Sequence, residues 1–68
     1  MITIKAKING SEEHTIREEK EFNVKELLNH LGMPININVV LYKGLPLPEN
    51  YVFKKDMEVD VITIFSGG

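Results

Sequence analysis

The stretch that decides the fold is EVDVITIFSGG, residues 58–68, with which the sequence finishes. The strand predicted over residues 58–65 is long and rich in β-branched side chains, which pack well on a pleated sheet and favour a central position. Gly67 and Gly68 have no Cβ atom, so the pair accepts almost any backbone angle and suits a narrow channel. Taken alone, a glycine pair is more typical of a frayed chain end, so the rest of the sequence has to supply the evidence for a function.

The composition is that of one small globular domain, residues 1–68. A chain of 68 residues buries only about 60% of its unfolded surface, so its core has to be compact. Little room remains for a substrate pocket beside that core, which argues against an autonomous enzyme. The hydrophobic fraction of 43% and the charged fraction of 26% are ordinary for a folded domain.

Charge and cysteine content exclude several further classes. Eight basic and ten acidic residues give a net charge of −2, without the basic face that nucleic-acid binding requires. The absence of cysteine removes disulfides, thiolate metal sites and thiol nucleophiles. No apolar run approaches the roughly 18 residues of a membrane span, and the first residues lack the layout of a secretion signal. We therefore expect a cytoplasmic protein that binds neither nucleic acid nor a membrane.

The beginning of the chain predicts a hairpin. Residues 2–8 alternate between apolar and polar side chains, as in a half-buried strand. Asn9-Gly10 is a strong two-residue turn signal, because both positions accept a positive φ. The following run, residues 14–19, is more polar and suits a solvated edge strand. We expect the strand over residues 2–8 to lie parallel to the last strand, in the middle of the sheet.

A helix is predicted over residues 24–31. Asn23 is a favourable N-cap, and Glu26 stands where a capping box requires an acidic side chain. Gly32 occupies the position of a left-handed C-cap, and Pro34 prevents the helix from continuing. Two turns of helix do not persist alone in water, so this helix must pack on a sheet.

The second half of the chain predicts two more strands around an irregular segment. In the strand over residues 37–42, Val39 and Leu41 share a face with Ile37, and Val40 and Tyr42 lie on the other face. The order of two strands, a helix and two strands implies an α+β domain in two layers. We expect a mixed sheet of four to five strands with one helix packed across it, followed by a flexible tail over residues 65–68.

Three stretches carry a resemblance to a known family: VVLYKGLPLPE (residues 39–49), FKKDMEV (residues 53–59) and SGG (residues 66–68). Through these stretches and the order of its elements, the whole chain resembles the β-grasp, ubiquitin-like family. Within it, the chain is most similar to the small prokaryotic sulfur carriers (ThiS/MoaD-like) and to the archaeal small ubiquitin-like modifier proteins.

The sequence departs from the family pattern in two places. Lys55-Asp56-Met57 stands where the family usually has Asp-Gly-Asp, so we expect Asp56 to take the positive φ of the missing glycine, at some strain. Prolines usually precede the diglycine in the small subunits of molybdopterin synthase, and they are absent here. The chain is therefore more similar to the thiamin-type carriers and the archaeal modifiers.

The resemblance implies that the chemistry takes place on Gly68. In this family an E1-like adenylyltransferase (ThiF/MoeB-like) consumes ATP to adenylate the terminal carboxylate. A sulfur donor or an enzyme cysteine then displaces AMP, which gives a thiocarboxylate or a thioester. The chain itself supplies Gly67 and Gly68, the tail residues Phe65 and Ser66, and a docking face. We expect no catalytic residue, bound cofactor or metal of its own.

Strand parity predicts the docking face. If the valines of the last strand face the helix, Ile62 and Ile64 face outward, and the same reasoning adds Val40 and Tyr42. A contiguous exposed apolar surface usually marks an interaction site, although single exposed apolar residues are common and need no explanation.

Three functions remain open at this point. In the first case the chain is a sulfur carrier that delivers sulfur to a biosynthetic enzyme for thiamin, molybdopterin, a thiolated tRNA base or a related product. Alternatively, it is a protein modifier that Gly68 joins to lysines of target proteins. In the third case it is a β-grasp binding module whose diglycine is accidental. The sequence does not separate the first two functions, because both use the same tail and the same type of activating enzyme.

Overall fold

The computed structural model describes residues 1–64. The tail predicted over Phe65, Ser66, Gly67 and Gly68 lies outside the described residues. The elements are, in order, β1 (Ile2–Ile8), β2 (Glu12–Glu18), β3 (Phe22–Asn23), α1 (Val24–Leu31), the 3-10 turn η1 (Ile35–Ile37), β4 (Asn38–Tyr42), β5 (Leu45–Leu47), β6 (Val52–Phe53) and β7 (Met57–Thr63).

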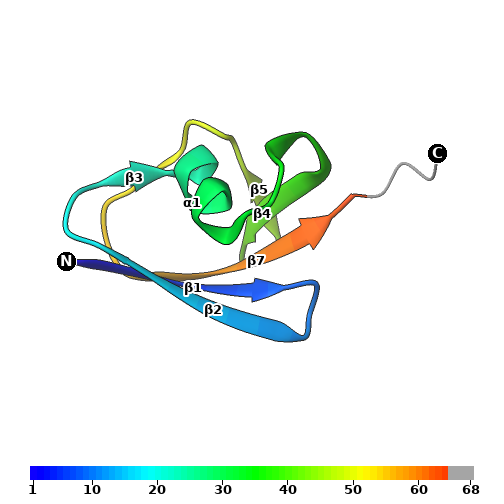
Figure 1. The fold of residues 1–68 in the computed structure, drawn as a ribbon, viewed down its shortest axis with the longest axis horizontal. Coiled ribbons are helices and arrows are strands. Elements are labelled where there is room, and N and C mark those ends of the chain that lie inside the picture. The colour runs from blue at the N-terminus through cyan, green and yellow to red at the C-terminus, as the bar shows by residue number, and fades with distance from the viewer. Residues whose placement is uncertain (65–68) are drawn as a thin grey trace.

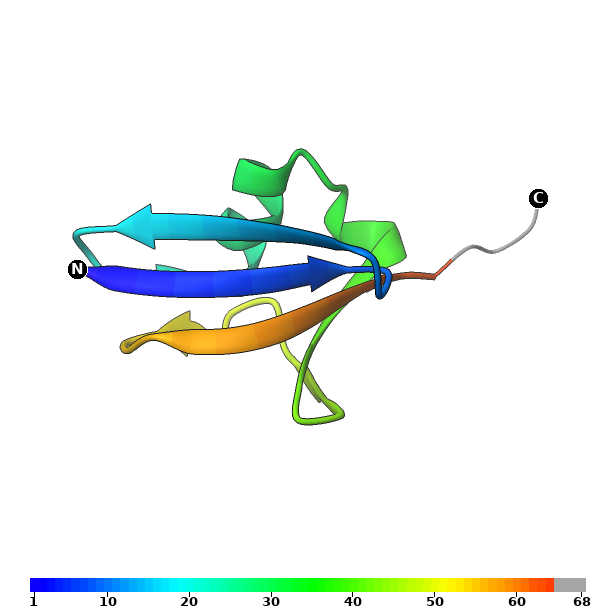
Figure 2. The ribbon, with the colours of Figure 1, turned by 90° about the horizontal axis from the view of Figure 1, so that it is seen from below.

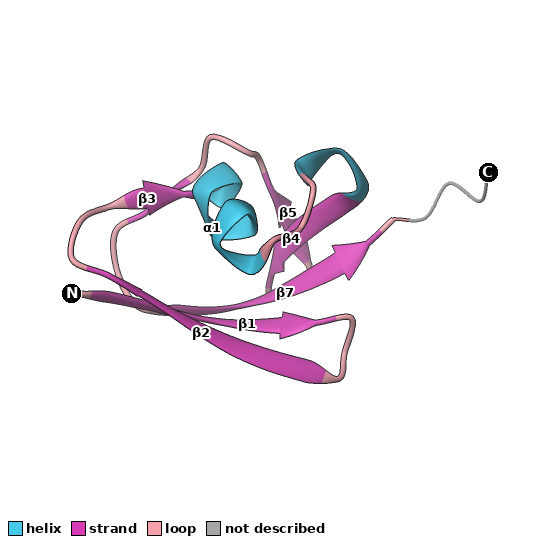
Figure 3. Ribbon diagram, viewed as in Figure 1, coloured by secondary structure: helices cyan, strands magenta, loops and turns pink. Residues whose placement is uncertain are grey.

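Within residues 1–64, five strands form a mixed sheet in the order β2-β1-β7-β4-β5, and β3 pairs with β6 in a separate two-stranded unit. Helix α1 lies across one face of the large sheet (Figure 1), and Figure 3 shows the same two layers by type of element. The predicted α+β architecture is confirmed. In this part of the chain, no helix has the length and apolar character required to cross a membrane.

Strands β1 and β7 are the centre of the sheet, as predicted. They run parallel, with Ile4 opposite Met57 and Ile8 opposite Val61. Along β7 the side chains of Met57, Val59 and Val61 are buried and those between them are exposed. Figure 2, seen from below, shows the two strands side by side. This alternation directs the valines of β7 toward the helix, because successive side chains of a strand point to opposite faces.

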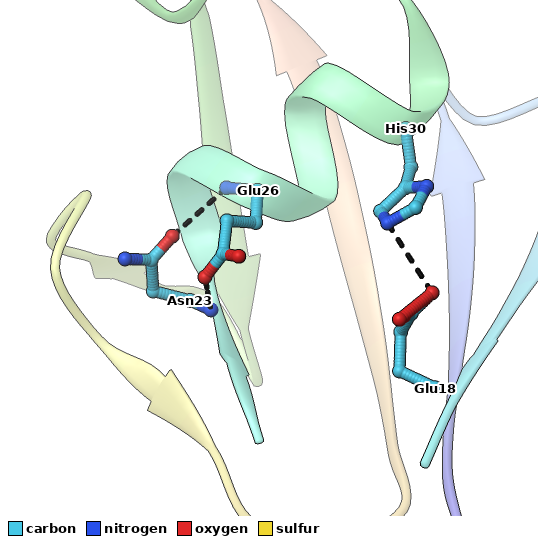
Figure 4. Close-up of polar contacts among 4 residues, drawn as sticks. All are labelled: Glu18, Asn23, Glu26 and His30. Atoms are coloured by element: carbon cyan, nitrogen blue, oxygen red, sulfur yellow. Dashed lines mark hydrogen bonds and ion pairs between the residues drawn. The ribbon is translucent and has the colours of Figure 1, made fainter. Parts of the chain in front are cut away.

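Helix α1 has the predicted bounds and both predicted caps. The Glu26 amide donates to Asn23 Oδ1 at 2.8 Å, and the Asn23 amide donates to Glu26 Oε1 at 3.1 Å. Figure 4 shows this reciprocal pair at the first turn of the helix. At the other end Gly32 is left-handed, with φ 69°, and its amide donates to Asn29 O at 3.1 Å. Caps of this kind satisfy backbone groups that the helix leaves without a partner.

A compact core fills the space between α1 and the sheet. Leu27 and Leu28 of the helix have no exposed surface, and neither does Phe53. The rings of Phe22 and Phe53 lie 5.3 Å apart and join the small two-stranded unit to this core. The buried apolar side chains are those of Ile2, Ile4, Ala6, Phe22, Val24, Leu27, Leu28, Val40, Phe53, Met57, Val59 and Val61.

The predicted faces of the strand over residues 37–42 were wrong. Val40 is only 1% exposed, and Tyr42 is partly buried against the core. Val40 therefore does not belong to the outer face of the sheet, whereas Tyr42 is partly exposed and lines a hollow there with Lys5 and Glu58. The prediction took Ile37 as the first inward residue, but Ile37 ends η1 and β4 begins at Asn38. The first inward residue of β4 is therefore Asn38, which is polar and whose Nδ2 donates to Pro34 O at 2.7 Å. A buried amide is tolerated when its hydrogen bonds are made.

The expected left-handed backbone at Asp56 was also wrong. Among the non-glycine residues of the described part, positive φ values occur at Asn9 (48°) and Lys43 (50°). Asp56 instead accepts a hydrogen bond from the Thr3 amide at 2.8 Å through its carboxylate. The missing turn glycine is therefore replaced by a different turn, in which the aspartate side chain satisfies the backbone at the start of β1.

Candidate functional site

The candidate site is the root of the tail, where β7 leads into the residues beyond Ile64. The Ile64 amide donates to Ile37 O at 2.6 Å, so backbone pairing with the residues just before β4 continues one position past the end of β7. The predicted activated residues Gly67 and Gly68, with Phe65 and Ser66, lie outside the described residues. The described part of the site is the support of the tail, up to Ile64.

An apolar strip lies beside this root on the sheet face opposite the helix. Ile62 is 38% exposed and Ile64 is 54% exposed, as predicted for the outward parity of β7. Val39 is half-buried and lies directly opposite Ile62 in the β4–β7 register. Ile37 is 36% exposed and bonded to Ile64 through its backbone. We call Ile37, Val39, Ile62 and Ile64 the outer strip.

Parity reasoning missed Val39 and Ile37 and included the buried Val40. The sequence of this segment carries little parity information, because four of the five residues of β4 are apolar or aromatic on both faces. The polar exception, Asn38, occupies the inward series. The bond of Asn38 to Thr63, 25 positions later, is a contact that strand parity does not supply.

The opposite end of the same sheet face is charged. A shallow hollow of about 640 Å³ lies there. In the register of β1 and β7, Lys5 lies beside Glu58 and Lys7 lies beside Asp60. The outer face is thus apolar near the tail and of mixed charge at its other end. The hollow is lined by Thr3, Lys5, Tyr42, Lys43, Asp56, Met57, Glu58 and Asp60.

The two histidines belong to separate surface pairs. His14 Nε2 lies 3.3 Å from Glu12 Oε2 within β2. His30 Nε2 lies 3.3 Å from Glu18 Oε2 and connects α1 to β2 (Figure 4). Exposed pairs of this kind contribute little to stability. In residues 1–64, no group of three or more His, Cys, Asp or Glu side chains is arranged to hold a metal ion.

Comparison with solved structures places this arrangement in a known fold. The UBL domain of Dsk2 from Plasmodium falciparum matches 91% of this chain and 96% of its own, with a TM-score of 0.69 and 18% identity. The fold is ubiquitin-like. A chain in the complex of pParkin, pUb and UbcH7 matches with a TM-score of 0.67 and 14% identity. That match spans 91% of this chain but only 22% of the other chain.

Neither the protein-family models nor the curated proteins give a match to this sequence. At the identities found among solved structures, the likeness establishes the ubiquitin-like fold alone. In that fold the outer strip and the end of β7 lie together on one face.

Proposed function

We propose that this protein is a sulfur carrier whose Gly68 carboxylate is adenylated by an E1-like enzyme and then converted to a thiocarboxylate. The observation that carries the proposal is the path of the chain in a ubiquitin-like fold. The central strand β7 leads through Ile64 directly into Phe65-Ser66-Gly67-Gly68. The proposal requires a free carboxylate on Gly68 in the mature protein.

The chemistry divides between the two proteins. An oxygen of the Gly68 carboxylate attacks the α-phosphorus of ATP, and pyrophosphate leaves. Hydrosulfide from a sulfur donor then attacks the acyl carbon, AMP leaves with its electron pair, and the product is the thiocarboxylate, with no change of oxidation state. The activating enzyme supplies the catalytic groups and consumes the ATP, so this chain is a substrate and not an enzyme.

The tail is long and narrow enough to carry the Gly68 carboxylate into the active site of the activating enzyme. Four residues beyond Ile64 span at most about 13–14 Å when fully extended. Two terminal glycines let the last part of this span pass through a narrow channel, because no Cβ atom widens it. The folded domain then remains outside the active site while its carboxylate enters.

The outer strip is the proposed docking surface for the activating enzyme. Its apolar side chains continue to Ile64, so a partner that binds the strip also receives the tail. The mixed charges at the other end of the same face suit the polar rim that surrounds the core of a protein interface. The match to a chain in the complex of pParkin, pUb and UbcH7 supports a protein as the partner of this fold.

Mass spectrometry of the protein from its native cells tests the proposal. A carrier gains the mass difference between sulfur and oxygen at Gly68. A protein modifier instead leaves branched tryptic peptides in which residues 56–68 are joined to a target lysine, because Lys55 is the last basic residue. If neither species forms and the mature chain carries residues after Gly68, the proposal is wrong.

A matched pair of tail variants tests the threading argument. Gly67→Ala adds a Cβ atom in the tail, whereas Ser66→Ala removes only a hydroxyl one position earlier. We expect Gly67→Ala to abolish ATP–pyrophosphate exchange by the activating enzyme and Ser66→Ala to retain it. Both variants should unfold at the temperature of the unaltered protein. Normal exchange with Gly67→Ala would show that a slender tail is not required.

A further inference from the structure

Three polar side chains from distant parts of the chain meet at the root of the tail. Asn9 comes from the β1–β2 turn, Asn38 opens β4, and Thr63 ends β7. All three are joined by hydrogen bonds between 2.7 and 3.0 Å long. We call Asn9, Asn38 and Thr63 the root clamp.

On one side, Asn9 extends the β1–β7 ladder with its side chain. The last register pair of the two strands is Ile8 and Val61. One more backbone hydrogen bond follows, in which the Asn9 amide donates to Val61 O at 2.8 Å. The Thr63 amide then donates to Asn9 Oδ1 at 2.9 Å, and Asn9 Nδ2 donates to Thr63 Oγ1 at 3.0 Å. The carboxamide of Asn9 therefore takes the place that a further peptide group of β1 would occupy.

On the other side, Asn38 holds the same threonine. The Thr63 hydroxyl donates to Asn38 Oδ1 at 2.7 Å, and Asn38 Nδ2 donates to Pro34 O at 2.7 Å. Asn38 is 6% exposed, so its two hydrogen bonds are partly shielded from water. The Thr63 hydroxyl thus accepts from Asn9 and donates to Asn38 at the same time.

We propose that the root clamp is a positioning device, which fixes where the tail leaves the domain and how long the free arm is. This inference rests on the proposed function. With the clamp closed, the arm is residues 65–68. If Thr63 were released together with Ile64, whose amide also donates to Ile37 O, the arm would have six residues and its greatest reach would rise from about 14 Å to about 21 Å. The activating enzyme would then have to immobilise the extra residues when it binds the tail.

The first test measures the clamp in the isolated protein. Asn9→Gly removes the carboxamide and retains the positive φ of the turn, because glycine adopts this conformation without strain. We expect amide hydrogen exchange at Thr63 to rise about tenfold, since both Asn9–Thr63 hydrogen bonds are lost and one of them is the bond that this amide donates. Thr15→Val, on the exposed face of β2, is the control and should leave exchange at that amide unchanged. If exchange at Thr63 is also unchanged in Asn9→Gly, no clamp exists, whether or not the protein is activated.

The second test measures positioning in the activation reaction. Thr63→Val keeps the shape of the side chain and removes the hydroxyl, whereas Thr63→Ser keeps the hydroxyl. We expect Thr63→Val and Asn9→Gly to raise KM for the carrier about tenfold, because each variant loosens Thr63 while the Ile64 amide keeps its bond to Ile37 O, and re-ordering one freed residue costs about this factor. Changes in kcat should stay within about twofold, because the Gly68 carboxylate reacts as before once it is bound in the active site of the activating enzyme. Thr63→Ser should restore KM to within about threefold of its original value.

The outcomes separate this inference from the proposed function. If the unaltered protein is never adenylated, the proposed function fails, and with it the positioning role. If the protein is adenylated and exchange at Thr63 rises in Asn9→Gly while KM stays the same, the clamp is only structural and the positioning role is wrong. A purely structural role also leaves KM unchanged at temperatures where every variant is fully folded.

Discussion

Val39 and Val40 are neighbours on β4 with the same side chain and opposite surroundings. Val40 is 1% exposed in the core, and Val39 lies half-buried on the outer strip. Replacing each with alanine removes the same two methyl carbons. The two variants therefore differ only in where those carbons lie, which makes them a direct test of the face assigned to β4.

The stability effect follows from burial. At about 0.8 kcal/mol for each buried carbon, Val40→Ala loses about 1.6 kcal/mol of transfer free energy. The cavity that remains increases the loss to roughly 2–3 kcal/mol. Val39→Ala should lose about 1 kcal/mol or less, because part of its side chain already contacts water. For a chain of 68 residues the total unfolding free energy is roughly 3–10 kcal/mol, so the difference between the variants is large.

Thermal unfolding followed by circular dichroism measures this difference. A domain of this size loses about 4–8 °C in Tm for each kcal/mol, so we expect a drop of roughly 10–20 °C for Val40→Ala. Affinity for the activating enzyme, measured well below both Tm values, should change in the opposite order. We expect Val39→Ala to weaken binding, because Val39 lies on the outer strip that we propose as the docking surface, and Val40→Ala to leave binding within about twofold. A larger loss of Tm for Val39→Ala would overturn the assigned faces of β4.

Three further variants test other parts of the molecule. Ile62→Glu should reduce affinity for the activating enzyme at least about tenfold, as expected for a central interface residue. It should lower the unfolding free energy by only roughly 1 kcal/mol, because the Ile62 side chain is 38% exposed; unchanged affinity in a binding titration would remove this residue from the docking surface. Asn23→Ala breaks the capping box with Glu26 and should cost about 1 kcal/mol in urea unfolding, whereas Asn23→Asp should be nearly neutral. Gly32→Ala places a Cβ in open space but keeps a φ of +69°, so its cost of about 1 kcal/mol is backbone strain; a thermal shift equal to that of Gly32→Asn would contradict this explanation.

Much of the fold could be predicted from the sequence where the deciding contacts are local. The helix has the predicted bounds because its capping box joins Asn23 to Glu26, which are three residues apart. The Asn9-Gly10 turn was predicted because both residues accept a positive φ, and they have it here. The central position of β7 followed from its length and β-branched side chains. In each case the residues that decide the conformation are close together in the chain.

The tertiary structure decided the features that depend on residues far apart in the chain. The buried face of β4 depends on Asn38, whose side chain is satisfied by Pro34 and by Thr63, 25 positions later. The root clamp joins Asn9 to Thr63 across 54 positions. Period-two alternation gives the same pattern for either face of an almost wholly apolar strand. Only the fold brings a partner to a polar side chain, and that partner determines whether an asparagine can be buried.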